Sequence, residues 1–116
     1  MAANQTAETF RRLKEEAENN RCVDCNGPDP QWASISHGTF ICLTCAGVHR
    51  GLGVHISFVR SLNLDSWSAK QLKLMSAGGN EAMINWFRKY SLPSDSPLDF
   101  KYKLIAVKFY RDRLRA

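Results

Sequence analysis

Four cysteines, arranged as two pairs, constrain this chain more than any other feature of its sequence. Cys22 and Cys25 are followed, after sixteen residues, by Cys42 and Cys45, which gives the spacing CxxC-x16-CxxC. Two thiolates from one tight turn can reach a single ion, and the second pair completes a tetrahedron, so the spacing predicts one zinc ion. Two disulfides or an iron–sulfur cluster are the alternatives. The polar start of the chain does not resemble a secretory signal, which favours zinc.

A site of four thiolates also predicts what the zinc ion does. Its coordination sphere is closed to water and substrate, so we expect a structural ion and not a Lewis-acid catalyst. Four thiolates and one Zn²⁺ sum to −2, which lowers the formal net charge from +5 to about +3. The three histidines, His37, His49 and His55, are then not needed as ligands, and we expect them to form hydrogen bonds or to pack beside the site.

The length and composition indicate a single domain over residues 1–116. The chain is 44% hydrophobic and 23% charged, which is ordinary for a globular protein and excludes fibrous or disordered classes. No stretch approaches the roughly 18 apolar residues of a membrane span, so we expect an intracellular soluble domain. Phosphate-binding glycine loops, paired carboxylates and Ser/His/Asp arrangements are not recognisable, so no catalytic constellation of an enzyme is predicted.

Hydrophobic spacing and turn residues predict an α+β fold, a small zinc-centred β-sheet surrounded by helices. We expect helices over residues 7–20, 43–49, 69–77, 81–90 and 97–114, a hairpin over 32–36 and 39–41, and a strand over 54–62. Ser68 and Gln71 fit a capping box, and Asn80 is placed to cap the helix that follows it. The inner stripe of the last helix is expected to be Leu98, Tyr102, Ile105, Ala106 and Phe109.

The distribution of charge singles out one arginine. Six basic residues and one acid lie between residues 101 and 115, whereas Arg50 and Arg60 are the only cations between Cys22 and Ala69. Arg50 follows the last cysteine by little more than one helical turn, and its planar guanidinium suits phosphate oxygens. Two structural roles remain open: Arg50 could bridge a carboxylate such as Asp65, or it could cap backbone carbonyls.

The run from Cys22 to Trp67 resembles the ArfGAP domain, the zinc-containing GTPase-activating module for Arf-family small GTPases. The matching segments are the cysteine array followed by x4-Arg50, PQWAS at residues 30–34, GVHRGLGVH at 47–55 and SFVRSLNLD at 57–65. The later GGN at 78–80 and the C-terminal helix also fit, and the layout is most similar to the Golgi-associated branch.

The resemblance implies a role for each matching residue. Cys22, Cys25, Cys42 and Cys45 would bind structural zinc. Arg50 would be an arginine finger that reaches the γ-phosphate of GTP held by Arf. Trp32 and Ile35 match positions that contact the GTPase, and Asp65 matches an acidic position that supports the arginine region. Packing for Trp32 and a helix-entry role for Asp65 are the alternatives. Arg60 could bridge an acidic partner or cap a strand edge, and we expect the second role.

The resemblance also implies a setting for the domain. The protein would activate a GTPase without hydrolysing GTP itself, and would act in vesicle trafficking as a cytoplasmic protein peripheral to Golgi membranes. Its partner would be GTP-bound Arf. We expect a monomer that binds no nucleic acid, with any membrane contact supplied by regions outside this chain.

Two other classes of protein compete with this interpretation. A DNA-binding zinc finger would suit the basic pI of 9.2, but the stretch after Cys45 holds too few cations for phosphate contacts. A non-catalytic adaptor would use the zinc module only to hold a partner, or would lay the basic last helix on anionic lipid.

Overall fold

A three-stranded antiparallel sheet lies at the centre of the computed structural model, which describes residues 3–93 and 96–116. The strands are β1 (Trp32–Ser34), β2 (Thr39–Ile41) and β3 (Val59–Ser61), in the order β2-β1-β3. Trp32 pairs with Ile41 on one side and with Ser61 on the other. The predicted hairpin is confirmed, and the short 3-10 helix η2 (Ile35–His37) forms its connection. The predicted α+β class is therefore confirmed.

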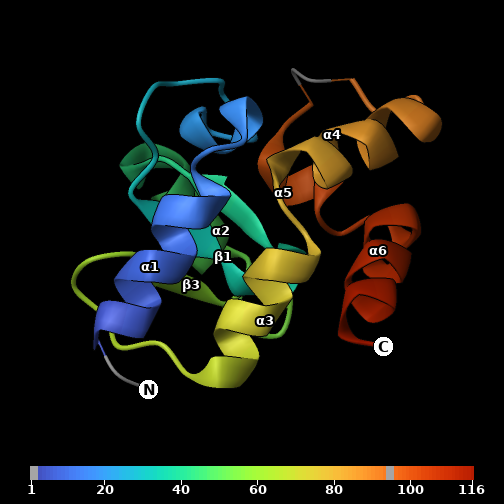
Figure 1. The fold of residues 1–116 in the computed structure, drawn as a ribbon. Coiled ribbons are helices and arrows are strands. Elements are labelled where there is room, and N and C mark those ends of the chain that lie inside the picture. Colours follow the sequence, from blue (N-terminus) through green and yellow to red (C-terminus); the bar gives the residue numbers. More distant parts are fainter. Residues whose placement is uncertain (1–2, 94–95) are drawn as a thin grey trace.

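Helices cover both faces of this sheet (Figure 1). On one face, Ala33 and Phe40 pack with α1 (Ala3–Leu13) and α3 (Ala69–Ala77). On the other face, Trp32, Ile41 and Val59 pack around the cysteines and α2 (Leu43–Gly51). This alternation follows the period of two in a strand, where neighbouring side chains point to opposite faces. The described residues include no helix long and apolar enough to cross a membrane.

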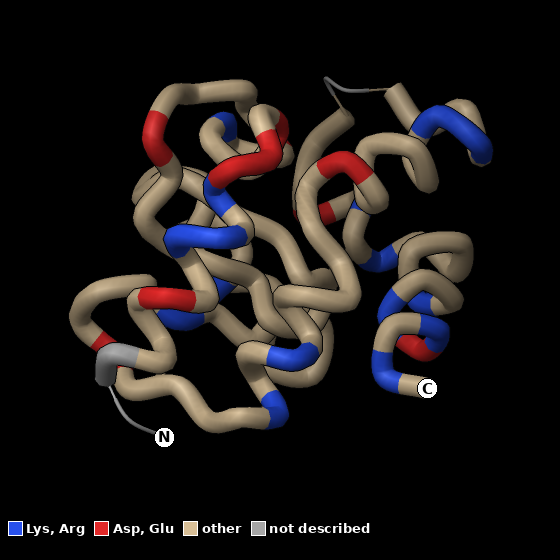
Figure 2. Tube along the Cα trace, in the orientation of Figure 1, with Lys and Arg blue, Asp and Glu red and all other residues tan. Residues whose placement is uncertain are grey.

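A second group of helices packs beside the sheet, around Tyr102 and Val107. It consists of α4 (Asn80–Lys89), α5 (Leu98–Lys101) and α6 (Ile105–Arg115), with Leu52 from the end of α2. Basic residues gather along α6 (Figure 2). The predicted capping box at the start of α3 is confirmed, since Ser68 and Gln71 exchange side-chain and backbone hydrogen bonds.

The first helix is shorter than predicted. It ends at Leu13, and a separate 3-10 helix, η1 (Ala17–Asn20), follows it. The side chains of Asn19 and Asn20 donate to the carbonyls of Leu13 and Lys14, at 2.8 and 2.7 Å. These bonds satisfy carbonyls that a continuing helix would have used, so the chain turns here.

The predicted strand over 54–62 is also too long, because only Val59–Ser61 pairs with the sheet. Gly53 has a φ of 98°, and its carbonyl accepts hydrogen bonds from the backbone N–H groups of Ile56 and Ser57, both at 3.0 Å. This turn occupies the residues that alternation alone assigned to a strand.

The last helix breaks in two, and its inner stripe differs from the prediction. Leu104 is extended (φ −66°, ψ 147°) between α5 and α6, which changes the helical register. The buried residues of α6 are Val107, Tyr110 and Arg111, while Ile105 and Phe109 are 68% and 55% exposed. The prediction for Ile105 and Phe109 is therefore wrong, whereas Tyr102 is buried as predicted.

Candidate functional site

The four cysteines of the sequence pattern converge at one point between the sheet and α2. Their Sγ atoms all lie within 4.8 Å of one another, and Cys25 Sγ lies 3.6 Å from Cys42 Sγ. Zinc at about 2.3 Å from each sulfur of a tetrahedron requires sulfurs about 3.8 Å apart, so this donor set fits one zinc ion. All four ligands come from the protein, which makes the site a structural one.

Local backbone structure places these thiols. In the first turn, the backbone N–H of Cys22 donates to Gly27, and that of Asn26 donates to Cys22, at 2.8 and 2.9 Å. In the second, Cys42 occupies the N-cap of α2 and its Sγ accepts from the N–H of Cys45 at 3.4 Å. Burial raises the pKa of the Cys22 thiol to about 11 and also raises the pKa of Cys45. Zinc binding must therefore displace protons from these thiols.

Arg50 lies in the last turn of α2, the helix that the zinc ligands Cys42 and Cys45 anchor at its start. Its side chain is exposed, and its guanidinium carbon lies 4.6 Å from the centroid of the half-buried Trp32 ring. Arg50 forms no ion pair with any of the residues that the structure describes. The bridge to Asp65, which the sequence left open, is therefore not formed among them.

Asp65 forms an ion pair with Arg60 and not with Arg50. Its carboxylate accepts the backbone N–H of Ser61 at 2.7 Å and lies 3.7 Å from Arg60 Nη1. Both contacts tie the loop after β3 to the end of that strand. Ile35, which the resemblance placed at a partner surface, is only 3% exposed and packs in the core with Ala33 and Phe40. The Ile35 side chain is therefore not available for contact, and only its support of the hairpin remains.

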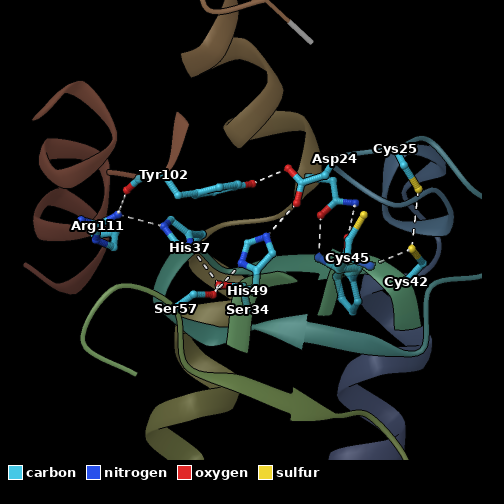
Figure 3. Close-up of polar contacts among 12 residues, drawn as sticks. Asp24, Cys25, Ser34, His37, Cys42, Cys45, His49, Ser57, Tyr102 and Arg111 are labelled. Atoms are coloured by element: carbon cyan, nitrogen blue, oxygen red, sulfur yellow. Dashed lines mark hydrogen bonds and ion pairs between the residues drawn. The ribbon is translucent and has the colours of Figure 1, made fainter. Parts of the chain in front are cut away.

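A line of buried polar side chains runs beside the cysteines (Figure 3), and in it His49 forms hydrogen bonds, as the sequence led us to expect. His49, fully buried, has Nε2 at 2.7 Å from Asp24 Oδ2 and Nδ1 at 2.6 Å from Ser57 Oγ. The hydroxyl of Tyr102 donates to Asp24 Oδ1 at 2.5 Å. Asp24 stands between two zinc ligands in sequence, but its partners are 25 and 78 residues away, so spacing gives no signal for them.

Two cations of the C-terminal helices are buried near this line. Lys101 is 1% exposed, and its ammonium lies 4.2 Å from the centroid of the Phe87 ring. Burial lowers the pKa of Lys101, while attraction to Asp24 and Cys45 opposes that shift. Arg111 is 9% exposed and donates to the carbonyl of Tyr102 at 2.9 Å. Lys101 thus holds positive charge inside the protein, where it is attracted to Asp24 and Cys45.

The fold and site define a zinc-finger domain with an exposed arginine at the end of the helix that follows the last ligand. The family described as "Putative GTPase activating protein for Arf" matches residues 7–114. The chain therefore belongs to the ArfGAP family.

Individual relatives support the assignment. The chain is 44% identical over 103 residues to the ADP-ribosylation factor GTPase-activating protein GCS1 of Saccharomyces cerevisiae, covering 89% of this chain and 29% of that protein. It is 43% identical over 108 residues to ADP-ribosylation factor GTPase-activating protein 3 of Bos taurus, covering 92% of this chain and 21% of that protein. It thus spans less than a third of either relative.

One solved structure is similar over nearly the whole chain. The crystal structure of a "putative GTPase activating protein for ADP ribosylation factor" from Cryptosporidium parvum matches with a TM-score of 0.90 and 36% identity. The match covers 98% of this chain and 91% of that one. The three-stranded sheet, its helices and the cysteine site therefore form the fold of this family.

Proposed function

We propose that this domain stimulates GTP hydrolysis by an Arf-family GTPase, with Arg50 supplied in trans to the γ-phosphate. The observation that carries the proposal is the position of Arg50, exposed and lying on Trp32, on a helix that the zinc ligands anchor. Membership of the ArfGAP family supports the choice of partner. The domain would complete the active site of the GTPase without holding a nucleotide itself.

Stimulation of phosphoryl transfer requires an arginine guanidinium held at a fixed position. Negative charge on the transferring phosphoryl group spreads over its oxygens in the transition state, and a guanidinium can bind two of them. An arginine supplied in trans contributes about 10³–10⁵ in rate, or about 4–7 kcal/mol of activation free energy. Such a gain requires placement to within about 0.5 Å. A helix that carries two of the four zinc ligands at its start would be held rigidly enough for this placement.

Neighbouring residues would form the rest of the contact surface. Trp32 presents a half-buried ring beside Arg50, and aromatic side chains in such positions often dominate binding energy. Asp65 would support the region through Arg60 and Ser61. Ile35 would act only by holding the hairpin that carries Trp32. In the cell the domain would act on Arf in vesicle trafficking, as part of a cytoplasmic protein at Golgi membranes.

Single-turnover hydrolysis tests the proposal directly. A myristoyl-free Arf loaded with GTP is mixed with this protein or with its Arg50→Ala variant, and the zinc content of both is measured. Acceleration by the first and none by the second, at equal zinc content, is the expected result. Equal acceleration by both would remove Arg50 from the mechanism. No acceleration by either, with retained binding of GTP-loaded Arf, would leave an adaptor.

A further inference from the structure

A continuous line of hydrogen bonds joins the last helix to the first zinc-binding turn (Figure 3). The line begins at Arg111 Nη1, which lies 3.2 Å from His37 Nε2. From His37 Nδ1 it passes through Ser34 Oγ and Ser57 Oγ to His49, and then to Asp24, with each of these contacts between 2.6 and 2.7 Å. Its members come from α6, η2, β1, the turn before β3, α2 and the first cysteine turn.

The two ends of this line fix its direction. A guanidinium can only donate and an ionised carboxylate can only accept. If each inner group donates toward Asp24, His37 carries its proton on Nδ1 and His49 carries its proton on Nε2. We assign these tautomers because every donor then meets an acceptor and both imidazoles remain neutral. Burial lowers the pKa of His37 well below its ordinary value, in agreement with a neutral ring.

The line passes through His49, the residue directly before Arg50 in the sequence. At its start, α2 is held by Cys42, which caps it, and by Cys45 in its first turn. At its end, the ring of His49 bonds Asp24 and Ser57 on opposite sides. The last turn of α2 is therefore held by two short hydrogen bonds within a buried environment. Among the residues that the structure describes, the Trp32 ring is the side chain over which the Arg50 guanidinium lies.

We infer that His49 is a positioning residue for Arg50: its bonds to Asp24 and Ser57 hold the last turn of α2 so that the Arg50 guanidinium lies over Trp32. The consequence for GTP hydrolysis rests on the function proposed above. The placement of Arg50 does not, because it can be measured without a GTPase.

Two variants of His49 distinguish the effect of its hydrogen bonds from the effect of its side-chain volume. His49→Leu removes both hydrogen bonds, whereas the amide of His49→Gln can reach the position of Nε2 and keep the bond to Asp24. His37→Gln is the matched control, since His37 is equally buried in the same line but forms its hydrogen bonds with Ser34 and Arg111 and not with α2. Ser57→Ala removes one bond to His49 without enlarging any side chain. Zinc content and the folded fraction are measured for each variant.

The first readout is the indole N–H resonance of Trp32 in a ¹H–¹⁵N spectrum, assigned with Trp32→Phe and calibrated with Arg50→Ala. We expect His49→Leu to move this resonance toward its Arg50→Ala position, His49→Gln to move it less, and His37→Gln to leave it unchanged. The second readout is hydrolysis at saturating GTP-loaded Arf. We expect His49→Leu to lower kcat about ten- to hundredfold with KM nearly unchanged, as misplacement of a catalytic group does.

Each outcome bears on the inference. The inference fails if His49→Leu keeps both the Trp32 resonance and kcat at wild-type values. It also fails if His37→Gln shifts the Trp32 resonance and lowers kcat as much as His49→Leu does. Should His49→Leu not fold, Ser57→Ala replaces it, and an unmoved Trp32 resonance in that variant overturns the inference. A wild-type protein that does not accelerate hydrolysis refutes the proposed function alone, while the Trp32 resonance still decides the role of His49.

Discussion

The guanidinium of Arg50 lies over the ring of Trp32, 4.6 Å from its centroid. Trp32 lies on β1, where it packs against the cysteine cluster, and Arg50 lies on α2, so the contact joins the sheet to the helix that carries Cys45. A cation over an indole gains about 0.5–1 kcal/mol at an exposed site. That is enough to favour one orientation of the arginine and small enough to be given up when a phosphate offers stronger bonds.

Arg50→Lys tests whether the planar fork of the guanidinium matters beyond its charge. Lysine keeps the positive charge but cannot bind two phosphoryl oxygens in the same plane. We expect the variant to be nearly as defective as Arg50→Ala, with GTP hydrolysis slowed about 10³-fold or more. Single-turnover rates at equal zinc content provide the measurement. Near-wild-type activation by Arg50→Lys would rule out the arginine-finger mechanism.

Trp32→Ala should weaken engagement of the GTPase. The substitution removes a half-buried aromatic side chain from the surface beside Arg50, and the loss of such an anchor costs about 2 kcal/mol, or roughly thirtyfold in affinity. Trp32→Phe is the matched control, because it keeps a ring under the guanidinium. Titration of GTP-loaded Arf with each variant measures the effect. If Trp32→Ala binds as tightly as Trp32→Phe, the ring serves packing and not recognition.

The metal site was predictable from the sequence because its ligands form two local pairs. Each CxxC turn brings two thiols together over a few residues, so the pattern carries its own geometry. The hairpin and the capping box of α3 were predictable for the same reason, since each is set by residues close in the chain. Arg50 was marked by its offset from Cys45, although nothing in the sequence showed that it would lie on Trp32.

The parts that the sequence did not predict depend on distant partners. Asn80 looked like a helix cap, but Gly79 takes the N-cap position and the Asn80 side chain bonds backbone groups of Phe40 and Arg21 instead. The break at Leu104 likewise turns a continuous helical pattern into two helices. The line from Arg111 to Asp24 spans most of the chain, so no local pattern records it.

Asn80→Ala should destabilise the fold strongly. The buried amide accepts from the N–H of Phe40 at 2.7 Å and donates to the carbonyl of Arg21 at 2.7 Å. Removing it leaves buried backbone groups without partners, at about 1–3 kcal/mol for each, so we expect a loss of about 2–4 kcal/mol in the free energy of unfolding. Urea unfolding measures it. Asn85→Ala, an exposed position on the same helix, is the control and should change stability by less than about 0.5 kcal/mol.

Removal of zinc should unfold the region around the cysteines. With the ion absent, the four cysteines no longer cross-link the first turn to the start of α2, and a small domain has little else to hold that face. We expect activity and helical circular dichroism to fall in proportion to the zinc extracted by a chelator, and Cys22→Ser to behave like the chelated protein. A chelated protein that kept its helical signal would show that the metal is not structural.

Acidification should weaken the fold through His37. Burial, aided by the nearby His49 and Arg111, lowers the pKa of His37 well below 6.5, so the folded protein keeps this ring neutral where the unfolded chain begins to protonate it. The unfolded state then binds more protons, and stability is complete above about pH 6.5 and lost as the pH falls below it. The loss grows as the pH falls toward 5.5, by at most about 1.4 kcal/mol for each pH unit.

Urea unfolding of the zinc-loaded protein at pH 8, 6.5 and 5.5 measures this loss, with zinc content checked at each pH. His37→Gln isolates the contribution, because a glutamine at position 37 does not titrate. We expect the variant to be less stable than the wild type at pH 8 and the difference in the free energy of unfolding to narrow as the pH falls to 5.5. A difference that is the same at every pH would mean that His37 is not held neutral by the fold.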